Sequence, residues 1–356
     1  MKKKSCKIVN RTSVRISAMA LAIIMALALA ACGGTTPAPG AGGNGGNGGD
    51  TTAGPVVLRL GTTVNESDSF QVAAEKFTEL INDRTGGAYQ IEIFPNAVLG
   101  DERTMLEGMQ MGTLDMGIIT SGPFVNFVPE MGVLDMPFLF TNNEEAYQIL
   151  DGEIGRSLLD SLQDSGLKGL AYAERGFRNL TNSNHPVTSA EDVLGLSIRV
   201  MENEVYIATF ENLGVNTIPM AWGDTLTALQ QGTIDGQENP VNVIYSHRFW
   251  ESQTYVTMTR HAYASAIITM SLGVFNDLSP EVQQIFLDSA QDAAVYQRAW
   301  TAYHENRQMA ELEANGMTVI HNPDIESFRA AVAGVYEMYS DRFGEKISLI
   351  NAELGR

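Results

Sequence analysis

The residues best suited to chemistry lie between 174 and 242, where arginine, tryptophan, asparagine and glutamate recur in a few short segments. Arg199 closes an apolar run, and its guanidinium is a planar fork that matches a carboxylate and stays charged at any working pH. Trp222 offers a flat apolar face for a carbon skeleton, and Asn239 both donates and accepts hydrogen bonds. Together these residue types indicate a site for a small organic carboxylate.

The patterns of common enzymes are missing from the sequence. The chain has five histidines: His185, His247, His261, His304 and His321. No two of them have the i, i+4 spacing of a zinc helix, and there is neither a Gly-x-Ser-x-Gly elbow nor a phosphate-binding loop ending in Lys-Ser or Lys-Thr. We therefore expect no catalysis, no metal and no cofactor. A secreted enzyme stays an alternative, because an active site assembled from distant residues leaves no local signature.

The N-terminus has the pattern of a secretory signal. Basic residues come first: Lys2, Lys3, Lys4, Lys7, Arg11 and Arg15. An apolar run, Ile16–Ala31, follows and ends in small residues before Cys32, which resembles the lipobox of bacterial lipoproteins. Residues 1–31 are thus predicted to be a cleaved signal peptide, Cys32 to be lipidated and the Gly-rich stretch 32–54 to be a flexible tether. An uncleaved membrane anchor or a buried helix is the alternative.

Charge and cysteine content narrow the partners further. The formal net charge is −19 although the predicted signal is purely basic, so the remainder is more acidic still. Nucleic acid and anionic lipid are poor partners for such a chain. A local anion site remains compatible with this charge, because salt screens exposed charges beyond about 8 Å. No cysteine follows Cys32, so disulfides are excluded from the folded part.

Strand and helix patterns alternate after the tether, as is typical of an α/β fold. Strands are expected at 56–61, 89–94, 116–120, 167–173, 197–201, 217–220 and 265–275. Helices are expected at 70–84, about 105–111, 205–213, 225–231, 280–315 and from 325 to the C-terminus. At about 1.5 Å per residue, the helix at 280–315 is long enough to brace two domains. The scattered methionines are expected to fill the core.

Several separated segments resemble, in order, the signature regions of one known family. They are Phe94-Pro95-Asn96, Leu99-Gly100-Asp101-Glu102-Arg103, Leu134-Asp135-Met136-Pro137-Phe138, Glu174-Arg175-Gly176-Phe177-Arg178-Asn179, Gly195-Leu196-Ser197-Ile198-Arg199-Val200, Pro219-Met220-Ala221-Trp222 and Asp235-Gly236-Gln237-Glu238-Asn239-Pro240. This order is similar to that of substrate-binding proteins of tripartite ATP-independent periplasmic (TRAP) transporters, the DctP type that includes dicarboxylate, sialic-acid and sugar-acid binders.

The resemblance implies a two-lobe clamp like that of periplasmic binding proteins, with hinge crossovers and a long helix bracing both lobes. Lobe I is expected to comprise residues 55–176 plus about 265–304. Lobe II is expected to comprise 177–264 plus about 305–356.

The resemblance also assigns ligand-binding roles. Arg199 matches the arginine that pairs bidentately with the ligand carboxylate, Arg178 a second arginine, Asn239 a polar contact and Trp222 an aromatic wall. Each residue has a plainer interpretation. In these interpretations, Arg199 merely ends a strand at the surface and Arg178 is exposed to solvent. Trp222 is then an ordinary core residue, and Asn239 begins a turn before a proline.

Four further residues complete the predicted site. Glu202 stands where some relatives carry an amide, and an acidic group there repels a second carboxylate while accepting bonds from sugar hydroxyls. Glu174 is within reach of a substrate hydroxyl or is simply solvated or paired with an arginine. Ser121 belongs to Thr120-Ser121, which lacks the acidic residue of sialic-acid binders, and Asp68 lies in a loop that often contacts ligand in the family.

A comparison of hydrogen-bond energies with the free energy of binding favours a hydroxylated ligand. A hydrogen bond to a charged group contributes about 1.5–3 kcal/mol, whereas micromolar affinity requires about 8 kcal/mol. One arginine fork is therefore insufficient, which favours a hexuronate or a related sugar acid; a C4-dicarboxylate or keto acid is the alternative.

The partners expected from the resemblance are the small carboxylate and the TRAP membrane subunits. The protein is expected to be monomeric, extracytoplasmic and anchored to the cell membrane by lipid alone. A sensory lipoprotein that presents its ligand to a receptor is the alternative from another class.

Overall fold

The computed structural model describes residues 54–356. The predicted signal peptide, Cys32 and nearly all of the predicted tether lie outside the described residues. No helix among residues 54–356 is long and apolar enough to cross a membrane.

Strands and helices alternate along most of the described chain. The strands are β1 (Val56–Gly61), β2 (Tyr89–Phe94), β3 (Met116–Thr120), β4 (Leu167–Asn182), β5 (Ser197–Val200), β6 (Asn216–Pro219), β7 (Gly236–Asn239), β8 (Tyr255–Ser271) and β9 (Thr318–Ile320). The α-helices are α1 (Ser69–Arg84), α2 (Glu102–Gln110), α3 (Asn143–Asp151), α4 (Glu153–Ser161), α5 (Glu204–Asn212), α6 (Trp222–Gln231), α7 (Val241–Ser246), α8 (Leu272–Asn276), α9 (Pro280–Ala314), α10 (Ile325–Ala331), α11 (Ala333–Met338) and α12 (Ser340–Glu353). The 3-10 helices are η1 (Gly122–Asn126), η2 (Pro129–Asp135), η3 (Leu162–Ser165), η4 (Ala190–Val193) and η5 (Phe249–Glu251).

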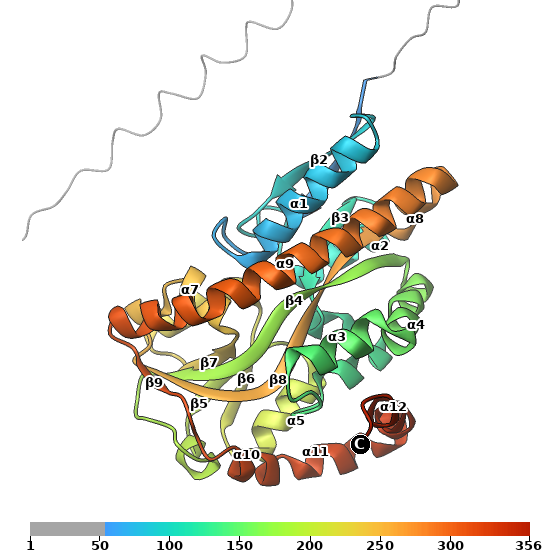
Figure 1. The fold of residues 1–356 in the computed structure, drawn as a ribbon. Helices are drawn as coiled ribbons and strands as arrows, with labels where there is room; N and C mark the ends of the chain where they lie inside the picture. The colour runs from blue at the N-terminus through green and yellow to red at the C-terminus, as the bar shows by residue number, and fades with distance from the viewer. Residues whose placement is uncertain (1–53) are drawn as a thin grey trace, which may run out of the picture. The chain divides into compact units, whose positions relative to one another are not determined.

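One sheet holds the molecule together, with the order β2-β1-β3-β8-β4-β7-β5-β6 and with β9 beside β8 (Figure 1). Strands β1–β3 form one parallel group and β5–β7 form another. Between the groups run the two long antiparallel strands β4 and β8. Each long strand passes from one parallel group to the other, so the pair forms the crossover between two βαβ halves.

The long helix α9 lies across both halves (Figure 1). Pro280 occupies its first turn, where a missing N–H costs nothing, and Ser279 caps it by accepting a hydrogen bond from Val282 N. The helix packs against α1, β4 and α7. The prediction of a bracing helix over 280–315 is confirmed.

Three element predictions need correction. Strand β4 extends to Asn182, beyond the predicted range 167–173, because it pairs with β8 on one side and β7 on the other. Irregularities in its pairing accommodate the polar run, one of them between Glu174 and Gly176. Strand β8 ends at Ser271 and gives way to α8, and the predicted C-terminal helix is divided into α10, α11 and α12.

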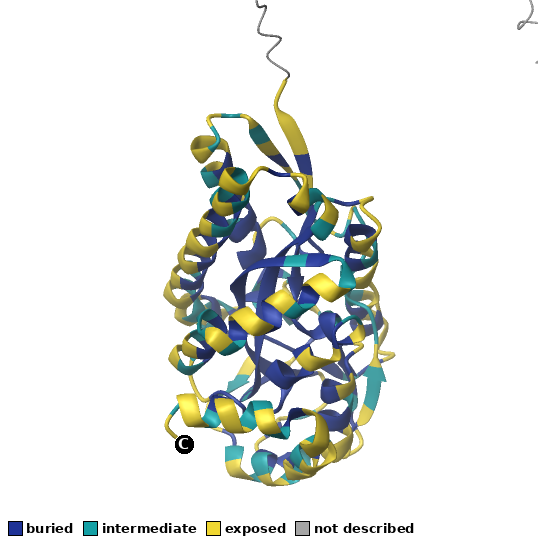
Figure 2. Cartoon of the chain, turned by 90° about the vertical axis from the view of Figure 1, so that its right-hand side faces the viewer, coloured by how far each residue is buried: buried dark blue, intermediate teal, exposed yellow. Residues whose placement is uncertain are grey.

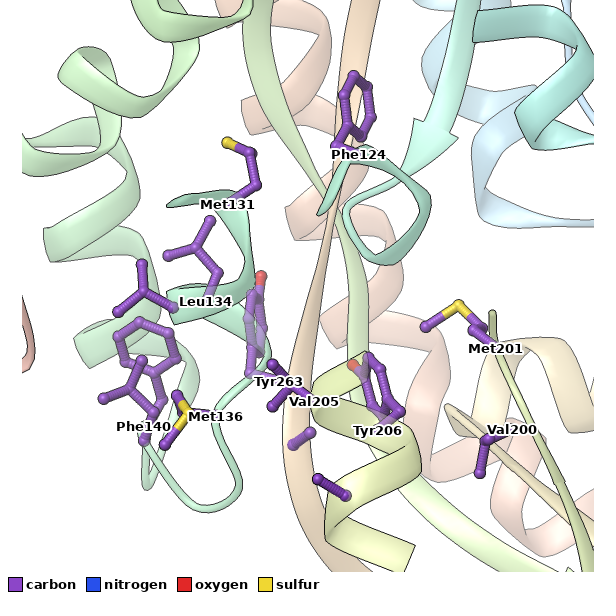
Figure 3. Packing of buried hydrophobic residues seen from close by; sticks show 14 of the residues in the cluster. Phe124, Met131, Leu134, Met136, Phe140, Val200, Met201, Val205, Tyr206 and Tyr263 are labelled. Carbon is purple, nitrogen blue, oxygen red and sulfur yellow. The ribbon is translucent and has the colours of Figure 1, made fainter. Parts of the chain in front are cut away.

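Buried apolar residues form three clusters: one beside β1–β3, one around α6 and α7, and a larger one that includes the C-terminal helices. Beside β1–β3, the ring of Phe77 on α1 meets that of Phe286 on α9 edge-on at 6.0 Å. A second cluster surrounds α6 and α7. The largest joins η2, α5 and the C-terminal helices, with Tyr206 and Tyr263 among its members (Figure 3). The central strands of the sheet are buried, while the outer helix faces and the edge strands β2, β6 and β9 are largely exposed or half-buried (Figure 2). The exact lobe boundaries stay a prediction.

Candidate ligand-binding site

Arg199 lies on β5, between the parallel strands β6 and β7, and is almost fully buried. Its Nε and Nη2 donate to the carbonyl oxygen of Met220 at 2.9 and 2.5 Å. Its hydrogen bonds to described residues use this side of the guanidinium alone, which leaves the Nη1 and Nη2 end as the fork for an anion. Burial lowers the pKa of Arg199 to about 10, so the side chain is still a cation at neutral pH.

Trp222 begins α6 and is half-buried. Its ring lies 5.8 Å from the central carbon of the Arg199 guanidinium and 6.2 Å from the stacked ring of Phe249. The edge of His247 meets it at 4.9 Å. The tryptophan is thus held by packing on one side and lines a pocket beside Arg199 on the other.

This pocket is open to solvent and, counted with the solvent space at its mouth, spans about 390 Å3. It is bounded on one side by the start of α2 and by η1, and on the other by β5, the segment after it and the β6–α6 turn. The lining residues are Asp101, Glu102, Arg103, Pro123, Asn126, Arg199, Met201, Glu202, Met220, Ala221 and Trp222. We call this space the Arg199 cleft; it lies between the two halves of the sheet.

Acidic groups face the arginine across the cleft. Glu102 accepts a hydrogen bond from Thr120 N at 2.8 Å, and burial raises its pKa against the opposing pull of Arg175 and Arg199. Glu202 is exposed at the rim and also acts on Arg199 electrostatically. The cleft therefore combines one buried cation with acceptor-rich walls, which suits a ligand with one carboxylate and several hydroxyls.

Arg178 and Asn239 lie buried behind the cleft. Arg178 forms a buried ion pair with Glu238, with Nη2 donating to Oε1 at 2.7 Å and to the Glu238 carbonyl at 2.6 Å. His261 Nε2 lies 3.1 Å from Glu238 Oε2. Asn239 donates to Gln237. Neither residue lines the Arg199 cleft, so their direct contact with ligand stays a prediction.

Two further predicted residues, Ser121 and Asp68, also bond within the protein. Ser121 donates to Asp135 at 3.3 Å. Asp68 caps α1 and pairs with Arg175 at 2.7 Å. Their roles as ligand contacts remain predictions that no geometry of the cleft supports.

Glu174 lies in a different, smaller cavity, which α9 and the start of α7 help to line. It accepts hydrogen bonds from the hydroxyl of Tyr147 and from Asn143, the latter at 3.3 Å. Glu305 lies in the same cavity and repels its charge. The cavity is separate from the Arg199 cleft, so a ligand contact by Glu174 also stays a prediction.

Sequence reasoning gave no role to Asp101, Glu102 or Glu238. Asp101 caps α2 by accepting from Thr104 N at 2.7 Å, and this capping residue was the available signal for a helix start at that point. The pairing of Glu238 with Arg178, sixty residues away, leaves no local pattern.

A family model described as bacterial extracellular solute-binding protein, family 7 (DctP) matches residues 60–342. The chain belongs to this family. The DctP protein from Escherichia coli (strain K12) named 2,3-diketo-L-gulonate-binding periplasmic protein YiaO is 38% identical over 296 residues, covering 83% of this chain and 90% of YiaO. The predicted resemblance is confirmed.

Solved DctP structures share the fold. A TRAP periplasmic solute binding protein from Polaromonas sp. JS666, bound to D-erythronate, is 40% identical, with a TM-score of 0.82 and coverage of 83% of this chain and 98% of that one. One from Roseobacter denitrificans, with bound β-D-glucuronate, is 31% identical, with a TM-score of 0.80 and coverage of 83% and 99%. The predicted two-lobe clamp is confirmed, and its family is one of extracytoplasmic binding proteins.

The cavity around Glu174 generates a prediction on stability. Burial raises the pKa of Glu174 to about 7 from an ordinary value of 4.5; its Tyr147 bond opposes this, Glu305 adds to it, and Arg298 and Arg260 oppose it. Because the pKa of this carboxyl is higher in the folded than in the unfolded chain, its contribution to the free energy of unfolding is fully present below pH 4.5. That contribution is lost as the pH rises to about 7. Between pH 4.5 and about 7, the free energy of unfolding of Glu174→Gln should therefore rise by about 3 kcal/mol relative to that of the wild type. Urea titrations at each pH measure this; the exposed Glu337→Gln is the control, and parallel pH profiles for Glu174→Gln and wild type would contradict it.

Proposed function

We propose that the chain is the solute-binding component of a TRAP-type secondary transporter and that it captures a hexuronate or related sugar acid. The observation that carries the proposal is the Arg199 guanidinium, buried in a cleft between the two halves with one donor edge left for an anion. A carboxylate on that edge receives two parallel N–H bonds, which fix its orientation as well as its position.

The surroundings of Arg199 favour one carboxylate over two. Asp101, Glu102 and Glu202 line the cleft, and Arg103, the other arginine there, already pairs with Glu107 at 3.1 Å. A second carboxylate meets acidic walls, whereas sugar hydroxyls donate to them. The sugar acids in the names of the relatives above point the same way. In this proposal Arg199, Trp222, Glu202 and Glu102 contact the ligand, while Arg178 and Asn239 support β5 from behind.

The proposal extends to partners and location. The chain acts as a monomer that closes on its ligand and delivers it to the membrane subunits of the transporter. Closure is of the hinge type, at the crossover strands β4 and β8. A lipid on Cys32 holds the protein at the cell membrane, and residues 33–54 give it reach. The chain binds and releases its ligand without turning it over.

Removal of Arg199 tests the anchor. Arg199→Ala should weaken sugar-acid binding by at least about 100-fold, since it removes a desolvated charge pair. Arg199→Lys should also bind weakly, because an ammonium lacks the fork. A thermal-shift panel of uronates, aldonates, C4-dicarboxylates, keto acids and sialic acid, followed by calorimetry, measures this. The exposed Arg307→Ala is the control. If Arg199→Ala keeps the full shift, or no carboxylate shifts the wild type, the proposal fails.

Glu202 should set the preference between ligand classes. Glu202→Gln removes a rim charge, so the ratio of dicarboxylate to uronate affinity should rise by about two- to fivefold, the range of an exposed charge interaction. Competition titrations with succinate and glucuronate give the ratio. Glu204→Gln, another exposed acid nearby, should leave it unchanged. An unchanged ratio in Glu202→Gln would remove Glu202 from the specificity argument.

The lipid anchor is tested in cells. Cys32→Ser should abolish incorporation of labelled palmitate and move the protein from the membrane fraction to the soluble fraction. Cys6→Ser, inside the predicted signal, should change neither result. If Cys32→Ser has lost its signal peptide, as a shortened N-terminus shows, and still stays fully in the membrane fraction, this anchor is ruled out.

A further inference from the structure

A second contact between the two halves lies away from the Arg199 cleft, where the start of α1 meets α7. Three hydrogen bonds make this α1–α7 contact: Asn65 Nδ2 to Ser246 O at 2.9 Å, Ser69 N to Asn242 Oδ1 at 3.1 Å and Ser246 Oγ to Asp68 Oδ2 at 3.2 Å. A fourth bond, from Arg175 Nη1 to Asp68 Oδ1 at 2.7 Å, joins the same carboxylate to β4. Helix α1 belongs to the core beside β1–β3, and α7 to the core beside β7.

Asp68 is the centre of this contact and is completely buried. One carboxylate oxygen caps α1 by accepting from Phe70 N at 3.0 Å and also accepts from Arg175; the other accepts from Ser246. The Arg175 guanidinium lies 4.1 Å above the centre of the Phe70 ring, which fixes its direction. A buried carboxylate needs such partners, because burial without them is strongly unfavourable.

The third participant comes from the crossover. Arg175 lies on β4 at the irregularity between Glu174 and Gly176, and Gly176 has a φ of 111°, which favours glycine. Asp68 therefore ties together one half, the other half and the strand that connects them. Moving the halves apart to open the Arg199 cleft must break the bonds of α1 to α7 and bring water to a buried ion pair.

We propose that Asp68 is a positioning residue, the centre of a latch that sets how long the lobes stay closed, and that it does so without touching the ligand. This proposal rests on the proposed function. Because the latch acts on opening, it controls the dissociation rate. Because the latch is remote from the ligand, its loss changes the dissociation rate of every ligand by the same factor. A residue in contact with ligand hydroxyls changes different sugar acids by different factors.

Dissociation kinetics test the latch. Stopped-flow fluorescence of the full chain follows release, with Trp222 beside Arg199 as the natural reporter. Asp68→Asn keeps a capping group on α1 but loses the charge, so dissociation should accelerate at least about tenfold, the loss of a bond to a charged group. Glucuronate and erythronate should show the same factor, and association should change less than about twofold. Asp324→Asn, the cap of α10, is the matched control.

A second variant keeps the ion pair intact. Ser246→Ala leaves Asp68 paired with Arg175, so its folding is not at issue, and its dissociation should accelerate by several-fold. Hydrogen exchange without ligand gives a readout independent of the proposed function: Ser246→Ala, on α7, should speed exchange at Ser69 and Phe70 on α1.

The outcomes are separable. Unchanged dissociation in both variants, or factors that differ between the two sugar acids, would overturn the latch while leaving the proposed function intact. If the wild type binds no sugar acid, the proposed function fails. The exchange at Ser69 then decides the latch alone, and unchanged exchange overturns it.

Discussion

Two buried arginines lie near the centre of the described structure, and of the two Arg178 alone bonds directly to a carboxylate there, a difference that organises the rest. Arg178 and Arg199 lie on neighbouring parts of the sheet, and Glu238 bonds directly to Arg178 alone. The charge of Glu238 raises the pKa of Arg199, while burial and the charge of Arg178 lower it. A desolvated cation without a directly bonded anion is unfavourable, and the Met220 carbonyl offsets that only in part. In the proposed function, an incoming carboxylate supplies the missing charge.

This constraint explains why the elements around Arg199 are so fixed. Strand β5 is held between β6 and β7, and β7 carries Glu238 to Arg178 on β4. Through β4 and β8 the same ion pair is connected to both halves of the sheet. The halves close over Arg199 at the cleft and over Asp68 at the α1–α7 contact. With the proposed roles, such a site separates two tasks, because one group recognises the ligand and another resists opening.

The sequence was sufficient for elements with a clear period or cap. The helix beginning at Pro280 and the βαβ patterns were predicted correctly, as was the fold class. It failed where tertiary pairing overrides local composition: the polar run after residue 173 was not predicted as a strand, yet β8 pairs with Glu174 and Gly176 and keeps this run in β4. In the site, Arg199, Trp222 and Glu202 do line one cleft. Glu102 was missed because its place depends on how α2 meets β5, which no local pattern encodes.

Residues of one chemical type have thus acquired different tasks through burial and partners alone. Arg178 has a dedicated carboxylate, so it stabilises the sheet; Arg199 shares one at a distance, so it remains available to a ligand. A fork of two charge-assisted bonds contributes less than micromolar affinity requires. The remainder has to come from acceptors such as Glu102 and from exclusion of water by closure, which strengthens each bond inside the cleft. In the proposed clamp, affinity is therefore a joint property of the Arg199 cleft and of the contacts that keep it shut.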